Sequence, residues 1–222
     1  MKSSVVFEQK NLETIENNIK NLLNGYDEFK SIRVIASPRA VGDIVQEILE
    51  EKMDSCFPKG VIKDFSGNFA RRAMADVAFT DVNDYYYVAD IKTHNKDTNF
   101  NMPNLTSVKR LADLYEDDRN SFIIVLAEYK VHGDGIIFDR VSLFPIEHLK
   151  WECLTIGALG WGQIQIANAR KVLIDRNQKR KDWMLKLCDS LAVFYPKEVE
   201  KILNERVNFF SNVRVSWAEK QD

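Results

Sequence analysis

Two aspartates stand in stretches that are otherwise typical of buried strands. Asp76 stands between an alanine and a valine, and Asp90 stands between an alanine and an isoleucine. An unpaired carboxylate in apolar surroundings costs several kcal/mol, so something must compensate each charge. Residues two apart in a strand share a face, so we expect Lys92 to point the same way as Asp90, and Ile91 to point the opposite way.

These residues have the composition of a site for a hard metal ion. If the two strands pair, Asp76 lies beside Asp90, and two carboxylates with a backbone carbonyl suit Mg²⁺, which completes its shell with water and phosphate oxygens. Lys92 could then contact the phosphate and the attacking water. Glu47 is a candidate third carboxylate, with a solvent-facing helix glutamate as the alternative. Taken alone the signal is weak, because an Asp–Lys pair at a strand edge is more often structural than catalytic.

The elements that must position these residues form an alternation of helices and strands. Apolar residues at helical spacing predict helices, and β-rich runs bounded by turn residues predict two hairpins and one short strand. The strands are expected at residues 73–80 and 85–92, 122–131 and 136–144, and 163–166. The helices are expected at residues 8–24, 38–53 (with Ser37 as N-cap), 105–115, 179–194 and from 196 onward. The helix over 8–24 is assigned to packing or to pairing between chains.

Composition bounds the kind of protein. The chain has 222 residues, of which 45% are hydrophobic and 29% charged, so it reads as one globular domain. No run is long and apolar enough for a membrane span or a signal peptide, which leads us to expect a cytoplasmic protein. The three cysteines are widely spaced and form no zinc pattern, so we expect reduced thiols.

The net charge of −2 neither requires nor excludes a nucleic-acid partner. The distribution is uneven, because the stretch 170–186 holds seven basic and two acidic residues, a net charge of +5. Such a stretch fits either a solvated helix face or a surface for a polyanion.

The order of the motifs resembles a known family. Asp76 followed by DIKTHN at 90–95 looks like the PD-(D/E)xK motif of type II restriction endonucleases. More specifically it resembles the HincII/EcoRV-like branch, because NMPN at 101–104, QIQI at 163–166 and RKDW at 180–183 fall in the same order as similar segments there. The resemblance covers roughly residues 40–195.

The resemblance implies an α/β fold with a restriction-endonuclease-like mixed β-sheet of five to six strands flanked by helices. It implies a single domain over 1–222, with a catalytic core at about 38–195 and a C-terminal helix at about 196–219. It further implies a homodimer that cuts double-stranded DNA at a short palindrome, using Mg²⁺ (with Mn²⁺ as a substitute) and no small-molecule cofactor. The products would carry 5′-phosphates, with blunt ends in that branch.

Carried over by residue, Asp76 and Asp90 would hold the metal with the carbonyl of Ile91, and Lys92 would position or activate water. The chain departs from the family pattern in having an alanine in place of proline before Asp76. It also carries His94 where the similar proteins have a basic residue, and it lacks the asparagine that the HincII pattern places before Gln-Ile-Gln. We therefore expect a different target sequence.

We expect DNA contacts from two sets of side chains, since basic residues grip phosphates and polar loop residues read base edges. The phosphate candidates are Arg71, Arg72, Arg170, Lys179, Arg180 and Lys181. The candidates for reading or wedging, together with the strand-end residues, are His94, Asn95, Asn99, Asn101, Asn104, Gly160, Trp161, Gln163 and Gln165. Structural hydrogen bonds for the glutamines and packing under its own loop for Trp161 are the alternatives.

Two other functions stay open from the sequence. The same catalytic core serves repair and junction-resolving nucleases, which act on a DNA structure rather than on a sequence. Alternatively, Asp76, Asp90 and Lys92 form a buried structural ion pair in a noncatalytic binding module, as buried pairs do elsewhere.

Overall fold

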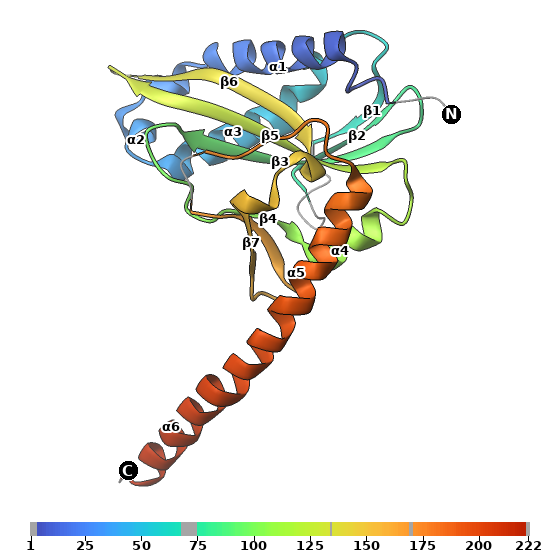
Figure 1. Ribbon diagram of the computed structural model, residues 1–222. Helices are drawn as coiled ribbons and strands as arrows, with labels where there is room; N and C mark the ends of the chain where they lie inside the picture. The colour runs from blue at the N-terminus through green and yellow to red at the C-terminus, as the bar shows by residue number, and fades with distance from the viewer. Residues whose placement is uncertain (1–3, 68–74, 134, 169–170, 221–222) are drawn as a thin grey trace. The chain divides into compact units, whose positions relative to one another are not determined.

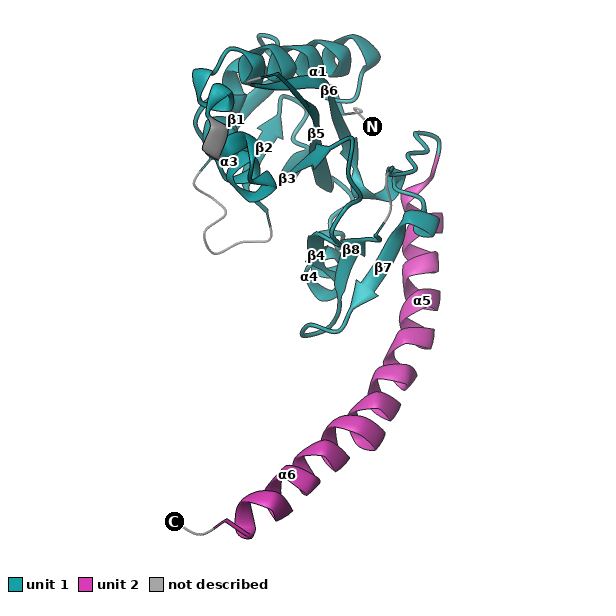
Figure 2. Cartoon of the chain, turned by 90° about the vertical axis from the view of Figure 1, so that its left-hand side faces the viewer, with its two compact units in different colours: residues 1–177 teal, residues 178–222 magenta. Residues whose placement is uncertain are grey.

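A computed structural model describes residues 4–67, 75–133, 135–168 and 171–220 of the chain (Figure 1). The chain divides into two compact units, which are residues 1–177 and residues 178–222 (Figure 2). The two acids and the lysine at the centre of the sequence hypothesis lie in the first unit.

The first unit contains a five-stranded sheet in the order β1-β2-β3-β5-β6. Its strands are β1 (Ile62–Ser66), β2 (Val77–Asp81), β3 (Tyr86–Asn95), β5 (Asn120–His132) and β6 (Gly135–Pro145). Neighbouring strands are antiparallel except β3 and β5, which are parallel. The predicted α/β class with a five-stranded mixed sheet flanked by helices is therefore confirmed, and both predicted hairpins form.

A tight turn joins β2 to β3 because its residue types satisfy the backbone locally. The carboxylate of Asp81 accepts hydrogen bonds from the N–H groups of Asn83 at 2.8 Å and Tyr85 at 3.0 Å. Asp84 adopts a left-handed conformation with φ of 67°, which aspartate tolerates better than most residues. The turn fixes the register in which Val77 lies opposite Ala89.

Two helices cover one face of this sheet. Helix α1 (Gln9–Asn24) packs on β6, and α3 (Pro38–Lys52) packs on β3 (Figure 1). The predicted N-cap is confirmed, since the Ser37 hydroxyl accepts from the Ala40 N–H at 3.2 Å. A single turn, α2 (Ile32–Ile35), precedes α3.

The apolar stripe of α1 lies inside the core of its own chain. Leu12, Ile15, Ile19 and Leu23 are buried in one cluster with apolar residues of the sheet. Burial of these side chains in the protein's own core removes the stripe as a surface for pairing. The packing role predicted for this helix is confirmed, and its role in pairing between chains stays a prediction.

The alternation of β3 separates the core from the candidate site. Ala89 and Ile91 belong to the core beneath the helices. Because side chains alternate along a strand, Asp90, Lys92 and His94 face the opposite side of the sheet. The parallel register with β5 places Lys92 opposite Leu126 on that second face.

A second sheet of three strands is present in the same unit. It has the order β4-β8-β7, with β4 (Asn104–Ser107), β8 (Gln163–Ile166) and β7 (Leu154–Gly157). The strand predicted at 163–166 is confirmed. The helix predicted over 105–115 is α4 (Val108–Leu114), because the residues before it pair with β8 instead, as Thr106 does with Ile164. Short 3-10 turns complete the unit at η1 (Asp27–Lys30), η2 (Met53–Cys56), η4 (Ile146–His148) and η5 (Trp151–Cys153).

The second unit is helical throughout its described part. Helix α5 (Arg180–Lys201) leads through a π-helical segment, η6 (Ile202–Val207), into α6 (Asn208–Ala218). The break predicted at residues 194–196 is wrong, because α5 continues through Pro196. None of the helices in the described part of the chain is both long and apolar enough to span a membrane.

Candidate functional site

The backbone brings the two predicted acids together. Asp76 directly precedes β2, and its N–H donates to the Ala89 carbonyl at 2.9 Å. Its side chain reaches the partner strand, where Oδ2 accepts the Ile91 N–H at 2.7 Å. Asp76 therefore sits against the peptide that links Asp90 to Ile91, as the predicted hairpin requires.

Asp90 is buried and only partly satisfied. Its side chain is 9% exposed, and Oδ1 accepts from the Lys92 ammonium at 2.7 Å. The other oxygen, Oδ2, is buried without a hydrogen-bond partner. A buried carboxylate oxygen without a hydrogen-bond partner is costly to the stability of the fold.

Other buried polar atoms without a partner carry no comparable charge. Among the described residues these are His94 Nδ1, Thr106 Oγ1 and His148 Nδ1. Burial lowers the pKa of both histidines, which favours their neutral form. Asp90 is therefore the only acid in this group of described residues.

Burial raises the pKa of both acids, so each resists ionisation. Desolvation raises the pKa of Asp90 to about 7, with Lys92 lowering it and Asp76 raising it. The pKa of Asp76 is raised by burial, lowered by the Ile91 N–H and Lys92, and raised again by Glu50. The carboxylates of Asp76 and Asp90 repel each other, and Glu50 adds to the negative charge at Asp76. Among the described residues, Lys92 is the one cation that lowers the pKa of both acids, so a further positive charge would be favoured here.

The donor set fits a magnesium ion by chemistry. The atoms concerned are the carboxylate oxygens of Asp76 and Asp90 and the carbonyl oxygen of Ile91, and hard oxygen ligands suit Mg²⁺. The Lys92 ammonium lies 2.7 Å from Asp90 Oδ1 and 3.4 Å from that carbonyl oxygen. Within the described residues, no cluster of three or more histidine, cysteine, aspartate or glutamate side chains is placed to hold a metal. The fit therefore rests on two acids and one main-chain oxygen.

The predicted third carboxylate, Glu47, lies on helix α3. Glu47 is exposed on α3, whereas Glu50, one turn further along, acts electrostatically on Asp76. The last turn of α3 lies against the end of β1, where a Cβ on Gly67 would come within 1.7 Å of the Glu50 carbonyl oxygen. The exposure of Glu47 agrees with the solvent-facing alternative, and its role as a third carboxylate stays a prediction, while Glu50 is the acid of this helix whose charge acts on Asp76.

His94 anchors a loop and does not face solvent. The residue is 4% exposed, and its Nε2 lies 3.0 Å from the Thr98 carbonyl oxygen. Its ring stacks on Phe100 with centroids 3.7 Å apart. These contacts give His94 a structural role at the end of β3, and its place among the DNA-contacting residues stays a prediction.

The loop that His94 anchors carries exposed asparagines. Asn99 and Asn101 are exposed, and Asn95 uses its side-chain oxygen to accept the Asp97 N–H at 3.0 Å. Asn95 is the last residue of β3, and Asn99 and Asn101 lie on the segment that joins β3 to β4. Asn99 and Asn101 keep the exposure that a base-reading residue needs.

The second sheet holds three of the remaining predicted readers. Gln165 donates through Nε2 to Asn104 Oδ1 at 2.7 Å, linking β8 to β4. Gln165 also covers Gly157 of β7, where a Cβ would lie 2.8 Å from its Oε1. The structural alternative stated for the glutamines thus describes Gln165, while Gln163 is half-buried on the same strand.

Trp161 lies in the turn between β7 and β8 beside Gly160. Its side chain is 63% exposed, and Gly160 is also exposed. A large aromatic at the tip of a turn is positioned for stacking on a base or wedging between base steps. The wedge hypothesis requires this exposure, and the role of Trp161 stays a prediction.

The predicted phosphate contacts fall outside the geometry described so far. Arg71, Arg72 and Arg170 lie outside the described residues. Lys179, Arg180 and Lys181 belong to the second unit, where α5 begins at Arg180. Their relation to the two acids therefore stays a prediction.

Comparison with models of known protein families and with curated proteins finds no match for this chain.

Proposed function

We propose that this protein is a Mg²⁺-dependent DNA endonuclease whose active site is formed by Asp76, Asp90 and Lys92. The observation that carries the proposal is the buried, unpartnered Oδ2 of Asp90, next to the carboxylate of Asp76 and beside a lysine. A polar group left unsatisfied in the folded protein is explained if it acts on a ligand. The resemblance to the PD-(D/E)xK pattern supports the choice of phosphodiester hydrolysis.

The residues divide the chemical work. Asp76, Asp90 and the Ile91 carbonyl would hold Mg²⁺, which supplies Lewis-acid stabilisation of charge and a bound water of lowered pKa. The Lys92 ammonium stabilises the negative charge that grows on the phosphate oxygens. Hydrolysis adds water across the P–O3′ bond, leaving a 5′-phosphate on one fragment and a 3′-hydroxyl on the other.

The finer proposal follows the resemblance. We propose a type II enzyme that acts as a homodimer on a short palindromic duplex and leaves blunt ends. The exposed Asn99, Asn101 and Trp161 support this by offering polar and aromatic groups to base edges. A junction-specific or repair nuclease would use the same acids and lysine on a DNA structure.

Incubation of supercoiled plasmid DNA with the purified protein tests the proposal. We expect discrete linear fragments with Mg²⁺ and none with a chelator, and no fragments from Lys92→Ala. Lys30→Ala is the matched control, since Lys30 is also paired to an aspartate but in an exposed position. Nicking at a cruciform without discrete fragments would favour the junction nuclease.

One geometric feature favours a noncatalytic alternative and sharpens the experiment. The 2.7 Å contact between Lys92 and Asp90 is also the geometry of a structural ion pair. In that case no divalent metal produces cleavage by the wild-type protein. Absence of cleavage with Mg²⁺ and with Mn²⁺ on several DNAs would contradict the nuclease proposal.

A further inference from the structure

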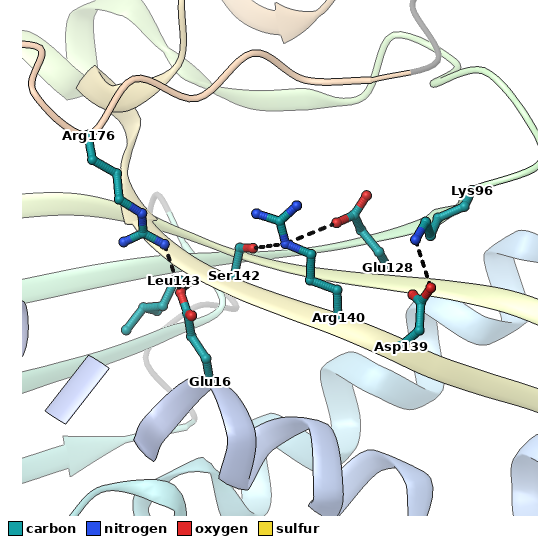
Figure 3. A network of polar contacts seen from close by, with 8 residues as sticks. All are labelled: Glu16, Lys96, Glu128, Asp139, Arg140, Ser142, Leu143 and Arg176. Carbon is teal, nitrogen blue, oxygen red and sulfur yellow. Dashed lines mark hydrogen bonds and ion pairs between the residues drawn. The ribbon is translucent and has the colours of Figure 1, made fainter. Parts of the chain in front are cut away.

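A cavity of about 520 Å³ opens on the sheet face that carries Asp90 and Lys92. Four cationic side chains line it, and they come from four separate segments of the first unit. They are Lys96 after β3, Arg140 on β6, Lys150 after η4 and Lys171 in the segment that follows β8. Figure 3 shows Arg140 and Glu128 side by side, and Lys96 reaching Asp139 of β6.

The cavity adjoins the candidate active site through the strand register. Lys92 on β3 is opposite Leu126 on β5, and Leu126 lines the cavity. Glu128 is opposite Arg140 on β6, on the same face. Neighbouring strands lie about 4.8 Å apart. The cavity therefore begins at β5, one strand away from Lys92, and extends to β6.

Arg140 is held with one edge of its guanidinium toward the protein. Its Nε lies 3.1 Å from Ser142 Oγ and 3.7 Å from Glu128 Oε2 (Figure 3). Among the described residues, its two Nη nitrogens have no hydrogen-bond partner. A guanidinium fixed through Nε presents its Nη pair as a fork, which matches the oxygens of a phosphate.

Two lysines of the cavity form ion pairs near the protein surface. Lys96 pairs with Asp139 at 2.7 Å and Lys150 with Asp175 at 4.0 Å, with the lysine side chains 35% and 44% exposed. Exposed ion pairs of this kind contribute about 0–1 kcal/mol, so a phosphate can replace the acid at little cost. No described residue accepts a hydrogen bond from the Lys171 ammonium. Among the described residues, Glu128 is the one acid that lines the cavity.

We propose that this cavity binds backbone phosphate of the DNA strand that the Asp76–Asp90 site cuts, with Arg140 and Lys171 as its principal contacts. The inference rests on the proposed function for the identity of the ligand. The negatively charged DNA backbone would pass from Lys92 over Leu126 to Arg140. This contact holds the strand in register at the acids without reading its sequence.

Binding of a fluorescent mixed-sequence duplex, measured without divalent metal over a range of salt concentrations, tests the inference separately from cleavage. Each neutralised phosphate contributes about 0.9 to the slope of log affinity against log salt. We expect Arg140→Ala/Lys171→Ala to lower the slope by about 1.8 and to weaken binding more than tenfold at low salt. The matched control is Lys10→Ala/Lys30→Ala, which removes the same charge from exposed side chains of α1 and η1 and should leave the slope unchanged.

The outcomes separate this inference from the proposed function. An unchanged slope in the double variant, or no salt-dependent duplex binding by the wild-type protein, overturns the inference. A lowered slope with no Mg²⁺-dependent cleavage supports the cavity and contradicts the nuclease. Inorganic phosphate is the second probe. It could raise the melting temperature of the wild-type protein but not of the Arg140→Ala/Lys171→Ala variant, while the salt slope of duplex binding is the same for the two proteins. In that case the cavity is a small-anion site and the DNA assignment is wrong.

Discussion

Two buried aspartates of the β2–β3 hairpin have opposite environments. Asp81 ends β2 at the turn, and Asp90 lies nine residues later on β3, at the open end of the hairpin. Asp81 is 0% exposed and accepts four hydrogen bonds, from the N–H groups of Val5, Asn83 and Tyr85 and from the Tyr87 hydroxyl. Asp90 has one partner, Lys92, and one buried oxygen with none. The hydrogen-bonding capacity of the carboxylate is satisfied at Asp81 and only partly satisfied at Asp90.

We propose that this difference separates an acid that serves the fold from an acid that serves the function. The donors around Asp81 tie the N-terminal segment and the turn to the sheet, so its charge serves the fold. At Asp90 the cost of burial raises the pKa to about 7, and no described backbone group lowers that cost. A carboxylate kept under these conditions is explained by a ligand that needs it, which in our proposal is a divalent cation.

The largest expected effect separates these two acids by activity. Asp90→Asn should lower the rate of plasmid cleavage about a thousandfold, since loss of metal stabilisation costs several kcal/mol of transition-state energy. Asp81→Asn, assayed under conditions where it is folded, should cut within about fivefold of wild type. Quantified gel assays at saturating Mg²⁺ measure both. Equal losses in the two variants would break the comparison.

The stability of the same two variants should change in opposite directions. Asp81→Asn places an amide among four donors and should cost about 2–4 kcal/mol of the free energy of unfolding. Asp90→Asn removes a buried charge and should raise the melting temperature at about pH 8 by roughly 3 °C. Urea unfolding and calorimetry provide the two values. A destabilised Asp90→Asn protein would indicate that the ion pair with Lys92 serves the fold.

The pH dependence follows from the raised pKa of Asp90. With an ordinary value of 3.8 and a folded value of about 7, the folded state holds one more proton than the unfolded state between these limits. Its contribution to stability is therefore present at low pH, falls as pH rises through that window, and levels off above about pH 7. Asp90→Asn should remove this decline, which melting temperatures of both proteins from about pH 4 to 8 would show.

Cleavage should follow the opposite trend, because metal binding needs the ionised carboxylate. We expect the rate of wild-type cleavage to rise with pH through about 7, and to do so at lower pH when more Mg²⁺ is present. Initial rates on plasmid DNA at two Mg²⁺ concentrations measure the shift. A midpoint that does not move with Mg²⁺ would separate Asp90 from the metal.

The smallest effect concerns His94, the third polar residue on that strand face. His94→Gln should change the cleavage rate by less than about threefold and lower the free energy of unfolding by about 1 kcal/mol, since the stacked ring is replaced by a smaller side chain. Activity assays and urea unfolding measure the two. A loss of cleavage comparable to that of Asp90→Asn would return His94 to the site.

The meeting of Asp76, Asp90 and Lys92 could be predicted because two local rules determine it. Alternation along a strand puts Asp90 and Lys92 on one face, and a short turn between two β-rich runs brings Asp76 opposite. The N-cap at Ser37 and both hairpins follow from local residue types in the same way.

Features set by contacts between distant segments could not be predicted. The influence of Glu50 on Asp76 depends on how α3 lies against the strands, and periodicity does not give that orientation. The pairing of β4 with β8 joins residues about sixty positions apart, as Asn104 and Gln165 show. The cationic cavity is lined by four segments that are distant in the sequence, and no local pattern in any one segment predicts that they meet.

The central claim is that Asp76 and Asp90 together hold a divalent cation. Its most direct test is the melting temperature of the wild-type protein, Asp76→Asn and Asp90→Asn at about pH 8, with and without Mg²⁺ or Mn²⁺. At a hundredfold excess over Kd, ligand binding stabilises by about 2.7 kcal/mol, so the wild-type melting temperature should rise by several degrees while both variants show no metal-dependent rise. An equal rise in the Asp90→Asn protein would contradict the account.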